Sequence, residues 1–472
     1  MSATSGDVLL AGRDALQRHA WDEAYDGLAQ ADRHGGLPPE GLQLLAEAAW
    51  FSSRPNVVLE VLERASKAYL DAGDRASAAM MAFRVAEQYG MRMTMPMAGG
   101  WIARAEELAA GDPTMPVHGY LAYIRGSMAL HQHDFDAATA CFDEALAIAA
   151  RTGDRDLAAR SLHDKGRVLC WNGRLAEGLA LMDEAMVAAV AGDLHPAAAG
   201  YVYCSMIDVC SHLGDYRRSA EWTAATARLC ERLQIPGFTG ICRVHRAELL
   251  RLHGNWPDAE EQARLACDEL PKSNFVFGLG HAFYEIAEVR RRMGDLDAAE
   301  AAYGRANEFG LEPEPGLSLL RMAQGRPAAA AAGLERLLNE EVKDPLTRLR
   351  LLVAQADVAM AIGVLETAAS ASNELDGIVK QLESVALHAV AARVRGALRL
   401  TQGDPRSAIA ELRRARDGWQ EIDAPYEVAE VRVLLGRAYL AVGEGEAAVM
   451  ELRTANATFE HLGATLAAES TA

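Results

Sequence analysis

The chain has 472 residues, half of them hydrophobic and 24% charged, with a formal net charge of -19 at pH 7. No run reaches the ~18 uninterrupted apolar residues that a membrane helix needs, and residues 1–17 lack the basic segment and long apolar core of a secretory signal. The acidic balance opposes a free-standing nucleic-acid-binding surface, which needs a concentrated basic patch. We therefore expect a cytoplasmic protein that contacts neither membrane nor nucleic acid directly.

The cysteines have no metal-binding or disulfide spacing. Seven are present, without a CxxC pair, and an odd count in a large chain favours reduced, buried thiols. Their positions are Cys141, Cys170, Cys204, Cys210, Cys230, Cys242 and Cys267.

One short pattern recurs along the chain. Residues 133–145 read HDFDAATACFDEA, with small residues five and twelve positions after the turn residue and an aromatic residue at nine. Residues 294–306, GDLDAAEAAYGRA, repeat it. Both stretches resemble the tetratricopeptide repeat, a pair of antiparallel helices. The small residues Ala138, Ala145, Ala299 and Ala306 would then lie where helices cross.

The spacing of the turns extends this pattern over most of the chain. Successive intervals are 40, 41, 40, 40, 31, 38, 40 and 40 residues, and a glycine stands seven residues before several turns. Because such repeats bury their apolar faces on their neighbours, the sequence predicts an all-α superhelical solenoid of about twelve antiparallel helix pairs. The turn residues are His133, Gly173, Gly214, Gly254, Gly294, Gly325, Gly363, Gly403 and Gly443, and the preceding glycines are Gly12, Gly126, Gly166, Gly396 and Gly436.

In chain order, the helix pairs occupy residues 6–34, 38–72, 75–110, 115–150, 155–191, 195–233, 238–270, 274–309, a shortened repeat after 311, and 345–381, 385–421 and 425–461. Gly153, Gly192 and Gly237 are predicted C-terminal caps, and Pro236 reinforces the last of them.

A proline-rich segment divides the repeats. LEPEPG at 311–316 shortens the next repeat because its two prolines stop the preceding helix, which makes it a candidate kink or hinge. We expect an N-terminal superhelix over 1–310, C-terminal repeats over 311–463 and a flexible tail over 464–472.

Methionines alternate in the segment GMRMTMPMAGGW, at Met91, Met93, Met95 and Met97. A Cu(I) site is one interpretation, but no Cys or His ligand lies nearby. We favour an extended connector that packs into a groove.

Catalytic motifs are absent from the sequence. It contains no GxxxxGK[ST], HExxH or GxSxG, so we expect no catalytic residues and no cofactor. His131, His133, Asp134 and Asp136 surround a turn whose other copies carry Gly-Asp, which favours a structural role over metal binding.

The first helices of stacked pairs line a concave face, where a ligand would bind. Counting back from each turn places aromatic and charged residues on that face, a combination that suits a protein or peptide partner or a small polar inducer. The candidate binding residues are Tyr120, Tyr123, Arg160, His163, Arg167, Tyr201, Asp208, Glu248, Arg251, His281, Tyr284, Glu288 and Arg291.

Repeats of about 40 residues are longer than the common tetratricopeptide repeat. Residues 99–109, 288–326 and 424–444 resemble the helical sensor region of bacterial transcription regulators of the MalT and LuxR type. In that family a DNA-binding helix-turn-helix would follow a segment like FEHLGA, whereas this sequence stops at Ala472. The resemblance implies a non-catalytic binding scaffold in bacterial signalling or transcriptional regulation. The alternatives are the sensor portion of a DNA-binding regulator and an enzyme on an α/α solenoid.

Overall fold

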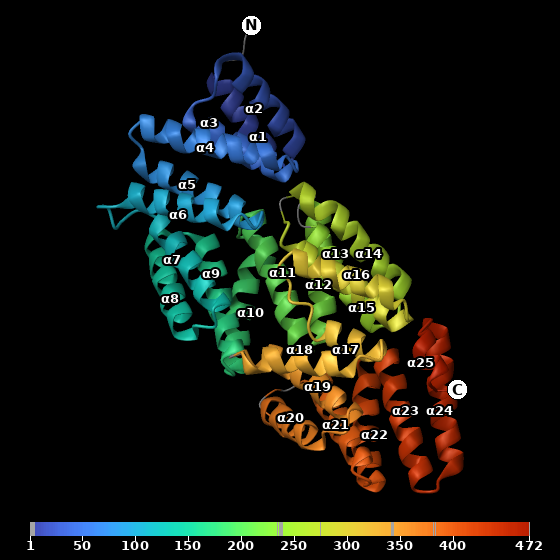
Figure 1. The fold of residues 1–472 in the computed structure, drawn as a ribbon. Coiled ribbons are helices and arrows are strands. Elements are labelled where there is room, and N and C mark those ends of the chain that lie inside the picture. Colours follow the sequence, from blue (N-terminus) through green and yellow to red (C-terminus); the bar gives the residue numbers. More distant parts are fainter. Residues whose placement is uncertain are drawn as a thin grey trace.

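The computed structural model describes residues 5–233, 235, 239–273, 275–340, 344–380, 382 and 384–471. This part of the chain forms 25 α-helices and one short 3-10 helix and contains no strand. Figure 1 shows the helices stacked as antiparallel pairs along a superhelix. The predicted all-α solenoid of about twelve pairs is confirmed. None of the described helices has the length and apolarity to cross a membrane.

The first five pairs are regular. Their helices are α1 (Ser5–Gln17), α2 (Trp21–Gly35), α3 (Pro39–Phe51), α4 (Pro55–Asp71), α5 (Arg75–Met91), α6 (Met95–Ala109), α7 (Val117–His131), α8 (Phe135–Thr152), α9 (Arg155–Trp171) and α10 (Leu175–Ala191).

The next three pairs form the middle of the chain. They comprise α11 (Pro196–His212), α12 (Tyr216–Leu233), α13 (Thr239–Leu252), α14 (Trp256–Glu269), η2 (Leu270–Ser273), α15 (Gly278–Met293) and α16 (Leu296–Glu308). The predicted caps Pro236 and Gly237 lie outside the described residues.

The last four pairs follow the proline-rich segment. They comprise α17 (Gly316–Ala323), α18 (Pro327–Asn339), α19 (Pro345–Ala361), α20 (Leu365–Val379), α21 (Val385–Thr401), α22 (Pro405–Glu421), α23 (Pro425–Ala441) and α24 (Gly445–Leu462), after which comes α25 (Thr465–Glu469). The helix α17 has eight residues, which accounts for the short repeat. The short α25 falls within the predicted tail, and the Thr465 hydroxyl donates to the Met293 carbonyl of α15 at 2.7 Å.

Each predicted turn residue has a positive φ, from 55° at His133 to 92° at Gly294. Glycine adopts this conformation without a steric penalty, which explains its use at eight of the nine turns. Where an aspartate follows the turn residue, it caps the next helix: Asp134 and Asp295 accept hydrogen bonds from backbone N–H groups three residues on. One dipeptide therefore makes the turn and starts the second helix.

The small residues allow the paired helices to approach closely. Ala138, Phe142 and Ala145 are fully buried, as predicted. A Cβ added at Gly166 would lie 2.6 Å from the Gly178 carbonyl oxygen, and one at Gly436 would lie 2.6 Å from Leu452. The glycines seven residues before the turns are thus required by helix crossing.

The methionine segment differs from its prediction. An extended connector in a groove is wrong, because α5 and α6 are joined by a three-residue turn in which Met93 has a φ of 61°. Met95 and Met97 belong to α6, and both are exposed along with Met93. The residues on both sides of the turn form helices, so the alternation of methionines in the sequence does not indicate an extended chain.

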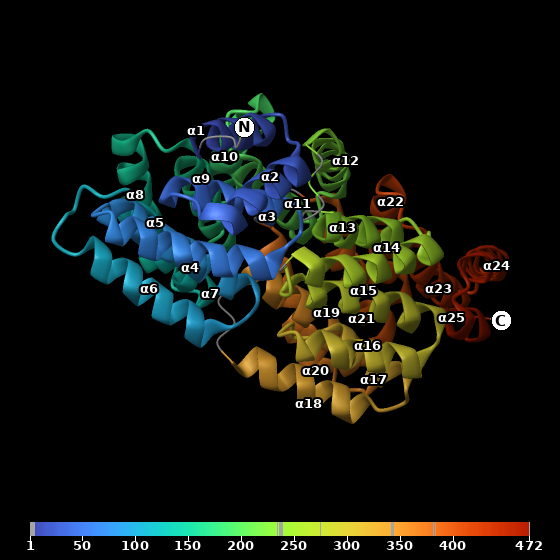
Figure 2. The ribbon, with the colours of Figure 1, turned by 90° about the horizontal axis from the view of Figure 1, so that it is seen from above.

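The superhelix turns tightly enough for distant repeats to touch. One hydrophobic cluster joins Leu45 and Phe51 of α3 to Phe275, just before α15, and to Leu279 of α15. In Figure 2 helices α1–α3 lie beside α11–α13. The Trp21 indole nitrogen also donates to the Leu233 carbonyl at 2.8 Å. The N-terminal repeats therefore pack on the middle ones.

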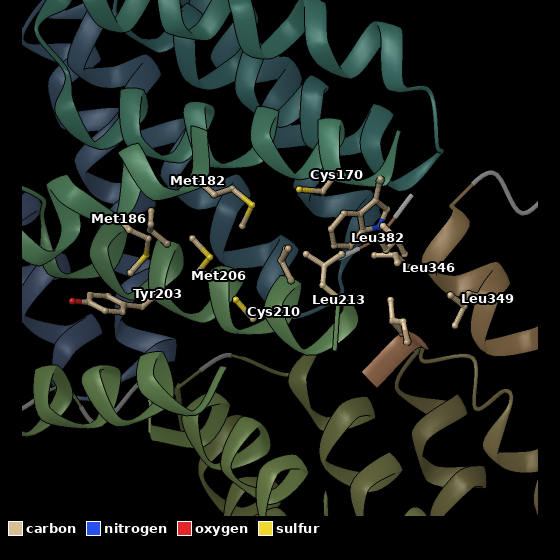
Figure 3. Close-up of a cluster of buried hydrophobic side chains, with 14 of the residues drawn as sticks. Cys170, Met182, Met186, Tyr203, Met206, Cys210, Leu213, Leu346, Leu349 and Leu382 are labelled. Carbon is tan, nitrogen blue, oxygen red and sulfur yellow. The ribbon is translucent and has the colours of Figure 1, made fainter. Parts of the chain in front are cut away.

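The C-terminal repeats pack on the same middle repeats from the other side. Leu213, after α11, shares a buried cluster with Leu346 of α19 and Leu382, as Figure 3 shows. Trp256 of α14 is fully buried with Phe459 of α24. The turn ends of α11 to α15 thus form the surface on which α19 to α25 dock.

Candidate functional site

The odd-numbered helices form the inner row of the superhelix, because from α5 to α23 each contacts the next odd-numbered helix. We call the surface they share the inner face. All thirteen candidate binding residues lie on the odd-numbered helices α7 to α15. The inner face therefore brings side chains of several repeats into contact with one another.

A buried carboxylate organises the part of the inner face between α7 and α11. Asp164 of α9 accepts hydrogen bonds from the hydroxyls of Tyr123 and Tyr201, each at 2.7 Å to Oδ2. His163 and Arg167 contact its other oxygen at 3.4 Å. Burial alone would raise the pKa of Asp164, but these contacts outweigh it and hold that pKa well below its usual range. Asp164 is therefore a fixed negative charge that ties three inner helices together.

Arg160 lies beside this carboxylate. Its guanidinium stands 4.5 Å from the centre of the Tyr123 ring and 5.2 Å from that of Tyr201, and it donates to Glu87 of α5 at 3.2 Å. Cation–π contacts and a carboxylate together compensate for its partial burial. Tyr120 instead donates to Asp154 at 2.8 Å.

The candidate binding residues differ in how far their side chains are exposed to solvent. Tyr120, Tyr123, His163 and Glu288 are buried in contacts between helices, so these four side chains do not face open space. His281 is exposed, and Tyr201, Glu248 and Tyr284 are half-buried. The exposed and half-buried residues are the ones that a ligand can reach.

Imidazoles and carboxylates gather in the middle of the inner face. Burial would raise the pKa of Asp208, but His212 and Arg167, with His245 and His281, lower it overall. The surrounding protein lowers the pKa of His281 although its side chain is exposed. His281 is thus accessible to a ligand.

Ion pairs continue along α13 and α15. Arg251 pairs with Glu285 at 2.7 Å, and Arg291 pairs with Glu288 at 2.9 Å. The Tyr303 hydroxyl donates to Glu288 as well. Burial would raise the pKa of Glu288, but the three arginines around it hold the pKa far below its usual range.

Two of the contacts that cross from α15 to the C-terminal repeats lie on the inner face. Arg292 pairs with Glu427 of α23 at 2.8 Å, and Arg350 of α19 donates to the Tyr284 hydroxyl at 3.4 Å. They join helices that are 135 and 66 residues apart in sequence. These contacts therefore join α15 to the C-terminal repeats on the inner face.

Several inner-face residues were missed from the sequence. Some candidate residues lie thirteen residues before a turn, as Arg160 and Tyr201 do. The same position in the later repeats holds Arg350 and Glu430. The same counting would have found Asp357 and Arg393, which pair at 2.8 Å. Asp164 and Glu427 fall outside the register positions used, and their roles follow from tertiary contacts.

His163 contacts Asp164, but the buried Ser161 hydroxyl makes no hydrogen bond within the described part of the chain. In the same residues, no three His, Cys, Asp or Glu side chains are grouped to hold a metal ion. The inner face offers ion pairs, phenols and imidazoles for contact with a ligand.

This geometry defines the class of the protein, a tetratricopeptide-like α/α superhelix whose inner helices carry a continuous row of charged and aromatic side chains. No protein-family model matches the sequence, and no curated protein matches it.

Several solved structures are similar to this chain in backbone arrangement, although their sequence identity to it is low. The Cut9–Hcn1 assembly of the APC/C shares 15% identity, with a TM-score of 0.46, over 100% of this chain and 96% of that one. A Rap protein complexed with competence and sporulation factor shares 15%, with a TM-score of 0.49, over 73% and 100%. A tetratricopeptide repeat protein from Parabacteroides merdae shares 14%, with a TM-score of 0.32, over 68% and 98%. The class therefore rests on the helices and turns of this chain.

Proposed function

We propose that this chain is a non-catalytic scaffold whose inner face binds an extended peptide, either free or as a segment of a partner protein. The supporting observation is a set of exposed polar side chains on the inner helices: His281 of α15, Arg350 of α19 and Glu430 of α23. Burial raises the pKa of Glu430, and the nearby Arg393 opposes this effect. Such groups are open to a ligand and poorly screened by solvent.

The mixture of charges favours a peptide over a nucleic acid. Arg160 and Arg167 lie near Asp164, and Glu248 and Arg251 follow on α13. A polyphosphate backbone needs a basic stripe, whereas a peptide presents amides, both charge signs and apolar side chains. Tyrosines on the same surface supply rigid anchors.

We further propose that the scaffold works in the bacterial cytoplasm, in signalling or transcriptional regulation, with a protein, peptide or small inducer as its ligand. The resemblance of residues 288–326 and 424–444 to sensor regions of MalT- and LuxR-type regulators supports this context. The division into a superhelix over 1–310 and repeats over 311–463 belongs to the same proposal.

The test of peptide binding begins with randomised synthetic heptapeptides, which are passed over the immobilised chain. Calorimetry then measures the affinity of the peptides that are retained. His281→Ala and Glu430→Gln should each weaken binding by about tenfold or more, because both groups contact the ligand directly. They should shift the melting temperature by less than about 2 °C, since neither side chain joins two helices. Val187→Ala on α10, 69% exposed, is the control and should change neither.

Equal affinity in wild type and both inner-face variants would place the ligand elsewhere. Absence of any retained peptide would remove the proposed function.

A further inference from the structure

A cleft lies on the helix pair α21 and α22 in the C-terminal part of the chain, where the pair packs between α20 and α23 (Figure 1). It has a volume of about 510 Å³, and Ala389 and Ala392 of α21 form its base together with Gly418 of α22. The candidate binding residues of the inner face all lie on α7 to α15. The cleft is therefore separate from the site described above.

Helical geometry places the cleft opposite the inner face. Arg393 of α21 pairs with Asp357 of α19 on the inner face. Arg395 and His388, which line the cleft, lie two residues after Arg393 and five residues before it. Because successive residues of an α-helix are rotated by about 100°, these two positions lie about 200° and 140° away from Arg393. Both point away from the inner face, and we call this site the outer cleft.

Small residues keep the outer cleft open. Gly418 lies fifteen residues after the turn of its repeat, and a Cβ at this position would lie 3.0 Å from Ala389 Cβ. In the fourth helix pair the equivalent residue is Ile148, and a Cβ at Gly119 would lie 2.9 Å from Ile148 Cγ2. Aliphatic residues occupy this position in three repeats: Ile148, Leu229 and Ile378. In α22 the glycine leaves that place to an apolar side chain from another molecule.

Both charged side chains that line the outer cleft are arginines. Arg395 and Arg414 share the buried carboxylate of Glu411, at 3.0 Å and 2.8 Å, and Arg395 also pairs with Asp376. The side chain of Arg414 is 67% exposed. A guanidinium has five N–H donors, and within the described part of the chain Arg414 donates one hydrogen bond, to Glu411. Its remaining donors face the solvent, where an anionic group can reach them.

The helix pair is basic within an acidic chain. Residues 385–421 contain seven arginines against four aspartates and glutamates, whereas the whole chain has a net charge of -19. At physiological ionic strength, exposed charges more than about 8 Å apart are largely screened. The local excess of arginines therefore decides which charge the outer cleft attracts, and it favours carboxylates.

The shape of the outer cleft favours a protein segment over a small molecule. Val385 and His388 line the cleft, and both are exposed, so the cleft is shallow. Sites for small molecules usually cover about 70–90% of the ligand surface. A protein segment instead inserts one side chain and leaves its backbone outside.

We propose that the outer cleft binds an acidic segment of a partner protein. One apolar side chain of that segment lies over Ala389, Ala392 and Gly418, and a neighbouring carboxylate pairs with Arg414. An apolar anchor in a pocket, surrounded by polar contacts, is the arrangement that carries most of the binding energy in protein interfaces. This site does not depend on the function proposed for the inner face.

The test measures the binding of fluorescein-labelled, amidated heptapeptides to the full-length chain by fluorescence anisotropy. A peptide with a central leucine flanked by glutamates should bind wild type about fivefold more tightly than one flanked by glutamines, because carboxylates pair with Arg414. Replacing the leucine by alanine in the glutamate peptide should weaken binding by about tenfold. Arg414→Gln should reduce the preference for glutamate to less than about twofold.

Three variants serve as comparisons. Arg406→Gln removes an exposed arginine of α22 that does not line the outer cleft, and it should behave as wild type. Gly418→Ile fills the cleft and should weaken binding of the leucine peptide by about tenfold, whereas His281→Ala on the inner face should leave it unchanged. Melting curves check the fold of each variant. Because Arg414 is exposed, Arg414→Gln remains a valid test even if Gly418→Ile separates α21 from α22.

Other outcomes overturn the proposal in distinguishable ways. Equal affinity for the glutamate and glutamine peptides, or binding of neither, would exclude an acidic partner segment. Equal affinity for the leucine and alanine peptides would remove the apolar anchor, and an unchanged preference in Arg414→Gln would place the peptide outside the outer cleft. Self-association of wild type that Arg414→Gln abolishes would make a second copy of this chain the occupant instead. None of these outcomes bears on the inner-face function, which His281→Ala tests by itself.

Discussion

At the scale of single residues, the burial of His163 on the inner face makes the stability of the protein depend on pH. Its side chain is fully buried, and burial lowers its pKa from the ordinary value of 6.5, more than the contact with Asp164 raises it. The folded protein therefore keeps His163 neutral at pH values where the unfolded chain takes up a proton. Stability from this residue is complete above about pH 6.5 and falls as the pH drops toward the lower folded pKa.

We predict that the free energy of unfolding decreases between pH 7.5 and 6.0 and that His163→Gln makes this decrease shallower. One buried histidine contributes up to about 1.4 kcal/mol per pH unit. Chemical denaturation at several pH values measures the slope, to which His245 and His281 also contribute because burial lowers their pKa. His461→Gln, at an exposed site on α24, should retain the wild-type slope. An equal slope in His163→Gln would contradict the neutral buried state.

At the scale of helices, the close crossing of α9 and α10 depends on two glycines. A Cβ at Gly166 would lie 2.6 Å from both the Gly178 carbonyl oxygen and Met182 Cγ. Because one of these atoms belongs to the backbone, rotation of a side chain cannot relieve the clash. The two helices must separate, and the buried methionine between them loses contacts.

We predict that Gly166→Ala lowers the free energy of unfolding by about 1 to 3 kcal/mol through overpacking. Gly304→Ala is the matched control, since Gly304 lies inside α16 with open space around its Cα. There the added methyl group improves helix propensity and should stabilise the protein by about 0.5 to 1 kcal/mol. Equal denaturation midpoints for the two variants would mean that α9 and α10 do not cross at Gly166.

At the scale of the whole molecule, the middle repeats hold both ends of the superhelix. Trp256 of α14 is fully buried and lies 5.5 Å, between ring centres, from Tyr426 of α23. A Cβ at Gly254 would lie 2.6 Å from Leu462 at the end of α24. These contacts are absent from a simple linear solenoid, in which each repeat touches its neighbours alone.

We predict that Trp256→Ala loosens the C-terminal repeats selectively. Removal of a buried tryptophan costs about 3 to 5 kcal/mol, and here part of that cost falls on the docking of α23 and α24. Hydrogen exchange should accelerate in α23 to α25 while α5 to α8 remain protected. Phe142→Ala, an equally buried aromatic in α8, should accelerate exchange around α7 and α8 instead. The same exchange pattern in both variants would show that the C-terminal repeats do not depend on Trp256.

The sequence by itself determined the repeat and its register. Glycines at intervals of about 40 residues prescribe positive φ, the aspartates that follow some of them prescribe helix starts, and alanines prescribe crossings, all of which are local requirements of one residue type. Counting from the turns also placed residues such as Arg160 and Tyr201 on the inner helices. This is possible because side-chain direction in a helix follows position along the chain.

Only the tertiary structure decided which inner residues are open and which are paired. Asp164 joins Tyr123 to Tyr201 because successive inner helices pack side by side. Arg350 meets Tyr284 because small rotations between repeats accumulate until helices farther apart in sequence come into contact. No local pattern encodes the sum of those rotations. The same accumulation joins α15 to the C-terminal repeats and leaves Arg350 without an ion pair to a described carboxylate, so the position of the ion pairs is a property of the complete superhelix.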